Sequence, residues 1–331
     1  MKKALFLSLR LGVLAVILSG CAPKNKNRVV LYCSVDEVYA KPLIKKLEAQ
    51  TGLQIDALFD TEATKTAGLA NRIRAEASRP RADVFWSSAL LQTLLMSDEK
   101  LLQPYDSPSA RDLPARFRGK DWVAVGARAR LQVSGSKGTG KSNLALIPMT
   151  NPVAISNPQF GTASDWATAW ATRWGQKSAL NWFKTLKIEP LSVLPGNGDV
   201  ARAVADGTML QGWTDTDDFL AEKRAAKKIF VVETVKENVL VPGAVSMLKN
   251  APHLENAKKL LDAIASAQNE RALTLEMPGV FSLRHLDEKS NFQSGSVDFS
   301  FLQSAPHDDY TKWAATWRQI REPLNQIFAS K

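Results

Sequence analysis

Runs of hydroxyl and acidic residues follow several apolar segments of this chain, where strands would end and helices would begin. Asp60-Thr-Glu-Ala-Thr64 follows one predicted strand, and Ser87-Ser88 follows the next one. Hydroxyls and backbone amides at such points can hold a small oxyanion, because helix N-termini carry a partial positive charge. Ser and Thr also cap helices without any ligand, and for one residue alone capping is the more common role. Their convergence on one place is therefore what would indicate a binding site.

A strand–helix–strand unit over residues 55–88 is predicted to position the first of these groups. Apolar and polar residues alternate over 55–60, which indicates a half-buried strand. Apolar residues recur at helical spacing over 69–77, and a short apolar run over 82–86 predicts the second strand. Parallel strands in such a unit place their carboxyl ends side by side at a crevice. We therefore expect Thr61 and Ser87 to lie near each other.

Three other turns carry groups of the same kind. Ser34 and Asp36 follow a predicted strand over 28–33, and Ser34 with Glu37 has the spacing of a capping box. Gly161-Thr162 opens a predicted helix, where glycine permits close backbone approach. Asn197 lies in a Gly-rich turn after another predicted strand.

An acidic turn, Thr214-Asp-Thr-Asp-Asp218, follows a short predicted strand over 209–213. Three carboxylates within four residues repel one another unless a positive group compensates them. One interpretation is an acidic helix start, which the helix dipole favours. The other is a counter-charge for a metal ion or an ammonium group, and the sequence leaves both open.

The N-terminus has the pattern of a lipoprotein signal. Lys2 and Lys3 precede an apolar run over 4–18, which ends in Leu18-Ser-Gly-Cys21. This predicts a signal peptide over residues 1–20, a lipid on Cys21 and a polar tether over 21–28. No later segment is long and apolar enough for a membrane helix.

One motif with a known chemistry is present but lacks its context. Gly135-Ser-Lys-Gly-Thr-Gly-Lys-Ser142 matches the phosphate loop of nucleotide-binding proteins letter for letter. Such a loop must lead into a helix, and Pro148 and Pro152 follow too closely for one. The segment is therefore interpreted as a surface loop.

The sequence contains no arrangement typical of an enzyme or of a nucleic-acid binder. Its three histidines, His253, His285 and His307, are far from the hydroxyl-bearing turns, and no catalytic or metal-binding motif includes them. Cys33 sits in an apolar run and is predicted to be a buried small residue without a disulfide partner. The formal net charge of +10 is spread along the chain, without basic-aromatic motifs. We therefore predict no catalytic residue, no cofactor and no nucleic-acid partner.

The chain resembles the ferric-iron-type periplasmic substrate-binding proteins of bacterial ABC importers, a group that also includes binders of phosphonates and sugar phosphates. The resemblance implies an α/β, type II-like fold of two lobes, each a mixed sheet flanked by helices, joined by crossover hinge strands. The long alternating segment 122–133 and the apolar segment 239–248 are expected to be the crossovers. Lobe 1 would comprise residues 29–125 plus 243–331, and lobe 2 residues 126–242. The stretches that carry the resemblance are Tyr32–Glu37, Asp60–Arg72, Ala82–Ser87, Asn157–Ala163, Gly212–Asp218 and Ala251–Ala257.

The resemblance implies a solute but does not choose among the solutes of the group. Ferric-binding members use two adjacent tyrosines in the loop that corresponds to 214–218, and the four tyrosines of this chain include no adjacent pair. We favour a small anionic solute, a phosphonate or phosphorylated compound, with Asp215 and Asp217 meeting an ammonium or hydroxyl group. The alternative is ferric iron held by Glu62, Asp215 and Asp217, since Fe(III) prefers anionic oxygen ligands.

The resemblance also implies the setting in which this binding occurs. The protein would be a monomer in the cell envelope, periplasmic and lipid-anchored through Cys21, and would deliver its solute to a permease and ATPase complex. No resident metal is expected. The predicted ligand-binding residues are Ser34, Asp36, Thr61, Glu62, Thr64, Ser87, Ser88, Gly161, Thr162, Asn197, Thr214, Asp215 and Asp217.

Overall fold

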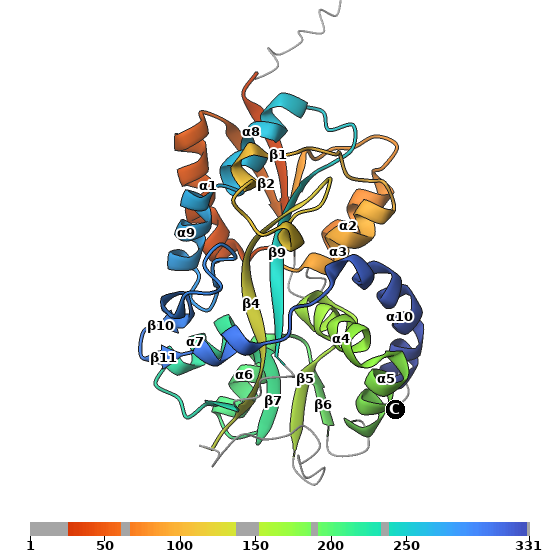
Figure 1. The fold of residues 1–331 in the computed structure, drawn as a ribbon, viewed down its shortest axis with the longest axis vertical. Helices are drawn as coiled ribbons and strands as arrows, with labels where there is room; N and C mark the ends of the chain where they lie inside the picture. The colour runs from red at the N-terminus through yellow and green to blue at the C-terminus, as the bar shows by residue number, and fades with distance from the viewer. Residues whose placement is uncertain (1–25, 61–66, 137–151, 187–190, 233–237, 330–331) are drawn as a thin grey trace, which may run out of the picture.

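The computed structural model describes residues 26–60, 67–136, 152–186, 191–232 and 238–329. Figure 1 shows two lobes, one above the other, connected by two long strands that run through both. Cys21, Thr61, Glu62 and Thr64, together with most of the phosphate-loop-like segment, lie outside the described residues. Within the described ranges, no helix combines the length and apolar character needed to cross a membrane.

One mixed sheet passes through both lobes, with its strands in the order β2-β1-β3-β9-β4-β7-β5-β6. The outer pairs in each lobe are parallel, whereas β9 runs antiparallel to both β3 and β4 at the centre. The first lobe holds β1 (Arg28–Cys33), β2 (Gln54–Phe59) and β3 (Val84–Ser87). The second lobe holds β5 (Val153–Ser156), β6 (Leu191–Leu194) and β7 (Gln211–Asp215). The crossovers are β4 (Val123–Ser134) and β9 (Val239–Met247); the short β8 (Phe230–Val232) pairs with β4, and β10 (Gln293–Ser294) pairs with β11 (Val297–Asp298).

Helices cover both faces of each half of the sheet (Figure 1). The first lobe carries α1 (Glu37–Thr51), α2 (Ala67–Ala75), α3 (Leu90–Asp98), α8 (Leu254–Ile264) and α9 (Ala267–Glu276). The second lobe carries α4 (Gly161–Trp174), α5 (Gln176–Leu186), α6 (Asn197–Ala205) and α7 (Thr216–Arg224). The last helix, α10 (Trp313–Ala329), packs against α4 and α5 and also contacts α3.

Most predicted elements occur near their predicted positions, because their apolar periodicity matches the faces that are buried. The predicted capping box at the start of α1 is wrong. Asp36, not Ser34, occupies the N-cap position, and it makes no side-chain capping bond. Ser34 is buried, and its hydroxyl accepts a hydrogen bond from the backbone N–H of Ser88 at 3.0 Å. Ser34 therefore bonds to Ser88, which is distant in the sequence, and not to the first turn of α1.

The crossover strand β4 changes its pairing register where it passes between the lobes. The register with β9 shifts between Ala124 and Ala127, and Gly126 in this bulge has a φ of 63°. A side chain at Gly126 would also collide with Val280, since a Cβ there would lie 2.8 Å from its Cγ1 atom. Ala127 then pairs with Phe281 on another segment of the chain. The bulge thus lies between the part of the sheet that holds β3 and the part in which β4 pairs with β7.

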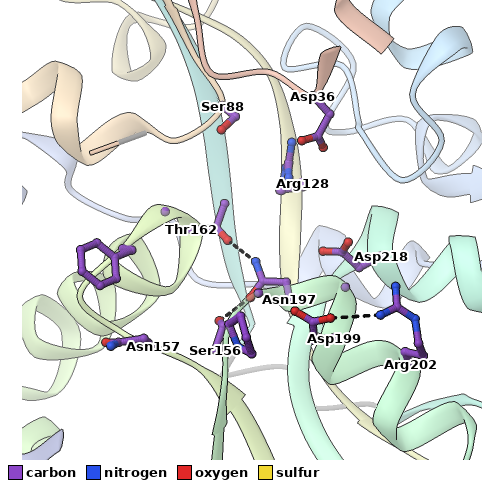
Figure 2. A pocket seen from close by; sticks show the side chains of 15 residues that line it. Asp36, Ser88, Arg128, Ser156, Asn157, Thr162, Asn197, Asp199, Arg202 and Asp218 are labelled. Carbon is purple, nitrogen blue, oxygen red and sulfur yellow. Dashed lines mark hydrogen bonds and ion pairs between the residues drawn. The ribbon is translucent and has the colours of Figure 1, made fainter. Parts of the chain in front are cut away.

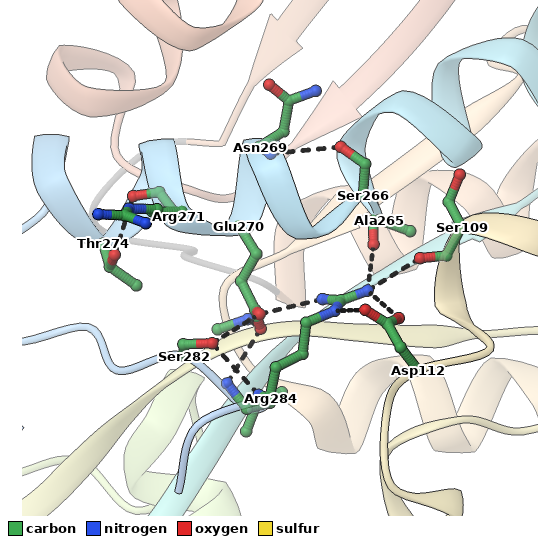
Figure 3. Close-up of polar contacts among 12 residues, drawn as sticks. Ser109, Asp112, Ala265, Ser266, Asn269, Glu270, Arg271, Thr274, Ser282 and Arg284 are labelled. Carbon is green, nitrogen blue, oxygen red and sulfur yellow. Dashed lines mark hydrogen bonds and ion pairs between the residues drawn. The ribbon is translucent and has the colours of Figure 1, made fainter. Parts of the chain in front are cut away.

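A buried carboxylate holds this bulge in place, and Figure 3 shows its contacts with Ser282 and Arg284. Glu270 on α9 accepts the backbone N–H of Gly126 at 3.1 Å, the group that the bulge leaves without a strand partner. Its other oxygen accepts from the Ser282 hydroxyl at 2.8 Å and from the Arg284 guanidinium at 3.0 Å. Arg284 also forms an ion pair with Asp112 at 2.7 Å. We call Asp112, Glu270, Ser282 and Arg284 the hinge clamp.

Candidate functional site

A cavity of about 600 Å³ lies where the turns of the two lobes face each other. In Figure 2, Asp36 and Ser88 project from the first lobe, and Arg128 projects from the crossover strand β4. The opposite wall comes from the second lobe and consists mainly of the turns that follow β5 and β6. The second-lobe residues that line it include Ser156, Asn157, Phe160, Gly161, Thr162, Asn197, Asp199, Arg202 and Asp218.

Four helices begin at this cavity, because each follows a strand whose carboxyl end points toward it. They are α1, which begins at Glu37, α4 at Gly161, α6 at Asn197 and α7 at Thr216. The first turn of a helix presents N–H groups without intrahelical partners, and the helix dipole adds positive charge there. The site is therefore built from backbone donors as well as side chains.

A buried ion pair lies beneath the second-lobe wall. Arg130 on β4 and Asp215 at the end of β7 stand opposite each other in the strand pairing, and both side chains are fully buried. Their nearest N–O distance is 3.1 Å. The Arg130 guanidinium also lies over the ring of Trp166, 4.9 Å from its centroid. Such a contact compensates part of the cost of burying the charge.

This ion pair fixes the polar side chains that face the cavity. Arg130 donates to the Ser156 hydroxyl at 3.0 Å and also to the side-chain oxygen of Asn197. The Asn197 amide donates to the Thr162 hydroxyl and to Asp215, each at 2.8 Å. Thr162 in turn donates to Asp215. We call Arg130, Ser156, Thr162, Asn197 and Asp215 the cleft floor, since the network holds three cavity-lining groups in fixed positions before any ligand arrives.

A second ion pair stands at the side of the cavity. Arg128 on β4 contacts Asp217 on α7 at 3.0 Å, and both side chains are almost completely buried. Burial opposes the charge on Arg128, but the nearby carboxylates, with Asp217 foremost, outweigh it and raise the pKa of the guanidinium above its ordinary value. Arg128 therefore stays charged, and Asp215, Asp36 and Asp218 add to the effect of Asp217.

The structure brings together five of the residues that the sequence predicted for the site. Ser88 and Asp36 line the cavity from the first lobe, and Gly161, Thr162 and Asn197 line it from the second. Their convergence follows from the parallel strands on either side of the crossovers, as expected.

Other predicted residues lie behind the wall rather than on it. Ser34 and Ser87 are buried, and the Ser87 hydroxyl donates to the backbone carbonyl of Ala89. Thr214 is buried and donates to the Asn197 carbonyl at 2.8 Å. Asp215 and Asp217 are engaged by arginines, so neither carboxylate points at the cavity as an isolated counter-charge. These residues support the site from within.

Sequence reasoning missed the two arginines of β4 and most of the loop that precedes α6. The signal for the arginines was available, because Arg128 and Arg130 stand at alternate positions of a largely apolar strand. A charge on a buried strand face requires a partner, and the only open question was which one. For Phe160, Asp199 and Arg202, which also line the cavity, the sequence carried no comparable signal.

The free cysteine and the three histidines are the other residues with potential reactivity. Cys33 is fully buried, as predicted, and burial raises the pKa of its thiol to about 12. Of the histidines, His253 contacts Asp83 at 2.9 Å and His285 contacts Glu288 at 2.9 Å. Neither they nor His307 are among the described residues that line the cavity.

The chain is similar to a known protein family and to individual known proteins. The family model described as "Bacterial extracellular solute-binding protein" matches residues 30–275. The chain is 24% identical over 326 residues to the major ferric iron-binding protein of Neisseria meningitidis, covering 91% of this chain and 96% of that protein.

Two solved structures show the same fold. Iron-bound HitA from Pseudomonas aeruginosa matches with a TM-score of 0.78 at 16% identity, covering 91% of this chain and 99% of that chain. The periplasmic binding protein AfuA from Actinobacillus pleuropneumoniae, with fructose-6-phosphate bound, matches with a TM-score of 0.75 at 20% identity, covering 92% and 99%. The predicted two-lobe α/β fold is thereby confirmed.

Proposed function

Because this chain belongs to the bacterial extracellular solute-binding protein family, we propose that it captures a small anionic solute between its lobes, a phosphonate or phosphorylated compound in preference to others. It then delivers the solute to the permease and ATPase of an ABC importer. The observation that carries this proposal is the start of α4 at the cavity. Its first turn contains no acidic residue, and its Thr162 hydroxyl is held by the cleft floor.

The chemistry of this wall suits an oxyanion. The backbone N–H groups at the start of α4 have the positive end of the helix dipole behind them. The Ser156 hydroxyl and the Asn157 and Asn197 amides surround the same space. The Ser156 hydroxyl and the Asn197 amide donate within the cleft floor and shape the wall, so the hydrogen bonds to a ligand would come from the backbone N–H groups of α4 and from the Asn157 amide. Closure of the lobes would remove these donors and the bound oxyanion from water together, which strengthens each hydrogen bond. Noncovalent binding without turnover is expected, since no nucleophile and base are paired among the described lining residues.

The cellular setting completes the proposal. A lipid on Cys21 would anchor the protein as a monomer at the membrane, with the tether 21–28 leading to the folded lobes in the periplasm. The proposed lobe boundaries are 29–125 plus 243–331 for lobe 1 and 126–242 for lobe 2. Helix α10 would then bridge the two lobes, because it contacts α3 as well as α4 and α5.

Ferric iron is the second candidate, and one observation favours it. Oxygen atoms of Asp215, Asp217 and Asp218 lie within 4.8 Å of one another, and the Neisseria meningitidis relative is named for binding ferric iron. To ligate iron, however, Asp215 and Asp217 would have to give up their arginine partners, which are buried with them. Separating buried ion pairs is costly, so this candidate ranks second.

Calorimetric titration of the refolded, ligand-free chain distinguishes the two candidates. We expect heat of binding with an alkylphosphonate or a sugar phosphate, and none with ferric citrate. Binding to ferric citrate alone, reversed by a chelator, would overturn the anionic-solute proposal. Mass spectrometry of the small molecules that copurify with the chain would then identify the compound itself.

A further inference from the structure

One wall of the cavity carries an aromatic side chain that the fold leaves uncovered. Phe160 lines the cavity and is 47% exposed, and among the described residues it is the only exposed large hydrophobic side chain that does so. The same lobe buries other rings completely, since Trp166 and Trp170 on the following helix are both fully buried. Single exposed hydrophobic residues are common on protein surfaces, but one inside a ligand cavity is placed where a ligand can cover it.

The turn before α4 fixes the position of this residue. Pro158 restricts the backbone of the turn. The Phe160 N–H donates to the carbonyl of Asn157 at 3.2 Å, and the Gln159 N–H donates to the side-chain oxygen of Asn157 at 3.0 Å. The Gln159 side chain also donates to the carbonyl of Arg321 on α10 at 3.2 Å. Phe160 then occupies the N-cap position of α4 without a side-chain capping bond, so its ring is not needed to start the helix.

Phe160 adjoins the groups that the proposed oxyanion would contact. The first turn of α4 begins at Gly161, directly after it, and Asn157, whose amide also lines the cavity, starts the turn before it. Pro195, a second exposed apolar residue, lines the same wall. It follows β6, which pairs parallel with β5, so Pro195 and the turn before α4 lie at the same edge of the sheet. The wall thus places apolar surface next to the oxyanion donors.

An inorganic anion and an organic one would use this wall differently. An inorganic ion that reaches the donors of α4 contacts little of the Phe160 ring and leaves it in water. An organic group on the same phosphorus extends over the ring and displaces that water. Covering roughly 50 Å² of its apolar surface is worth roughly tenfold in affinity.

We propose that Phe160 is a specificity-determining residue, whose ring packs against the organic part of the solute while the oxyanion lies at the start of α4. This inference rests on the proposed function, since it takes the oxyanion site from it. The solute is then an organic phosphonate or phosphate ester with an apolar or ring-shaped group near its phosphorus, and inorganic phosphate binds more weakly. Closure of the lobes covers the ring together with the donors.

A matched pair of probes tests this inference, namely phenylphosphonate and methylphosphonate, which share the oxyanion and differ in the organic group. In calorimetric titrations of the full chain, we expect phenylphosphonate to bind about tenfold more tightly. Phe160→Ala should remove most of this preference by weakening the binding of phenylphosphonate, whereas Phe160→Tyr, which keeps the ring, should retain it. Because the ratio of affinities is compared between proteins, the different acidity of the two probes does not affect the result.

The control is Leu275→Ala, which removes an exposed hydrophobic side chain on α9 that is not among the described residues lining the cavity. It should leave both affinities unchanged. Equal binding of the two probes by the unchanged chain would overturn the role of Phe160 and leave the anionic-solute proposal standing. An equal loss of both affinities in Phe160→Ala would do the same, since the ring would then pack against the protein and not against the organic group. Binding of neither probe by the unchanged chain would overturn both proposals.

Discussion

Two buried networks hold the crossover strand β4, and both are built from an arginine and a carboxylate. In the hinge clamp, Arg284 contacts Glu270 at 3.0 Å beside the bulge at Gly126. In the cleft floor, Arg130 contacts Asp215 at 3.1 Å a short distance further along the same strand. The clamp is closed, since Arg284 donates its remaining hydrogen bonds to Asp112 and to backbone carbonyls. The floor instead presents Ser156, Thr162 and Asn197 to a cavity.

This difference indicates what each network does. A closed network satisfies groups that would otherwise be buried without partners, and its contribution is to stability and to the geometry of the hinge. A network with one face on a cavity fixes the shape of the cavity wall in advance, and its contribution is to affinity, because a preorganised site loses less entropy when a ligand binds. The same arginine–carboxylate pairing thus stabilises the fold near Gly126 and positions the cavity wall near Asn197.

Glu270→Ala should have the largest effect on stability. It leaves the Gly126 N–H and part of the Arg284 charge buried without their partner, and we expect the free energy of unfolding to fall by about 3–5 kcal/mol. Urea denaturation followed by circular dichroism measures this change. Affinity for the bound solute, measured below the unfolding transition, should change much less.

Glu270→Gln provides the matched comparison, because it keeps the shape and an acceptor oxygen but removes the charge. The free energy of unfolding should fall by about half as much as in Glu270→Ala, since hydrogen bonds to a charged group are roughly twice as strong as neutral ones. A loss below about 1 kcal/mol for the alanine variant would show that the clamp does not stabilise the hinge.

A buried carboxylate between the lobes should make the stability of the protein depend on pH. Asp165 on α4 accepts the backbone N–H groups of Leu90 and Leu91 at the start of α3, at 2.8 and 3.2 Å. Burial raises its pKa from 3.8 to about 8, despite those two hydrogen bonds. The stabilisation of the protonated form is present in full below pH 4 and is lost as the pH rises toward 8, so stability should fall across this range by roughly 2–4 kcal/mol from this group.

Asp165→Asn tests that expectation because its amide stays neutral at every pH. Urea denaturation at several pH values should show a flatter dependence for the variant than for the unchanged chain between pH 4 and 8. Parallel curves for the two proteins would contradict the assignment to Asp165.

Asn197→Ala separates binding from stability. The variant loses the amide that joins Thr162 to Asp215, so the cavity wall is no longer fixed. We expect phosphonate affinity to fall about 10- to 100-fold, with only about 1–2 kcal/mol lost in unfolding. Calorimetry and urea denaturation on the same preparation measure both quantities.

The matched variant in the other network is Ser282→Ala. It removes a hydroxyl that donates to Glu270 at 2.8 Å in the hinge clamp. Its unfolding free energy should fall by about 1 kcal/mol while the phosphonate affinity stays within about twofold. If both variants lowered affinity equally, the distinction between the two networks would fail.

The sequence was sufficient for features that depend on local periodicity. The alternation over 122–133 predicted the crossover strand β4, and the hydroxyls after successive strands led to Ser88 and Thr162 in the cavity. It was insufficient for features that depend on register between distant strands. Arg130 faces Asp215 only because β4 pairs antiparallel with β7, and no local pattern encodes that partner. Asp217 meets Arg128 because α7 packs against β4, which is likewise a contact between segments distant in the sequence.

Burial depth was the other quantity that periodicity could not supply. Ser34 and Ser88 both follow strands of the first lobe, and yet Ser88 lines the cavity whereas Ser34 supports it from behind. The pattern assigns a residue to a strand end, but the depth of that end depends on the neighbouring turns, as the bond from the Ser88 N–H to Ser34 shows. The sequence therefore predicted which kinds of polar residue line the wall, but only some of the individual residues.

The smallest effect is expected from the second glutamate of α9. Glu276 contacts Lys46 on α1 at 2.5 Å, but both side chains are substantially exposed, at 38% and 54%. Water competes for both charges and salt screens them, so Glu276→Ala should change the free energy of unfolding by less than about 0.5 kcal/mol. Urea denaturation at low and at 1 M salt measures the difference, which should vanish at high salt. Glu270→Ala on the same helix should keep its large loss at both salt concentrations, because the Glu270 and Arg284 side chains are buried. A loss from Glu276→Ala comparable to that of Glu270→Ala would mean that burial is not what gives the hinge clamp its strength.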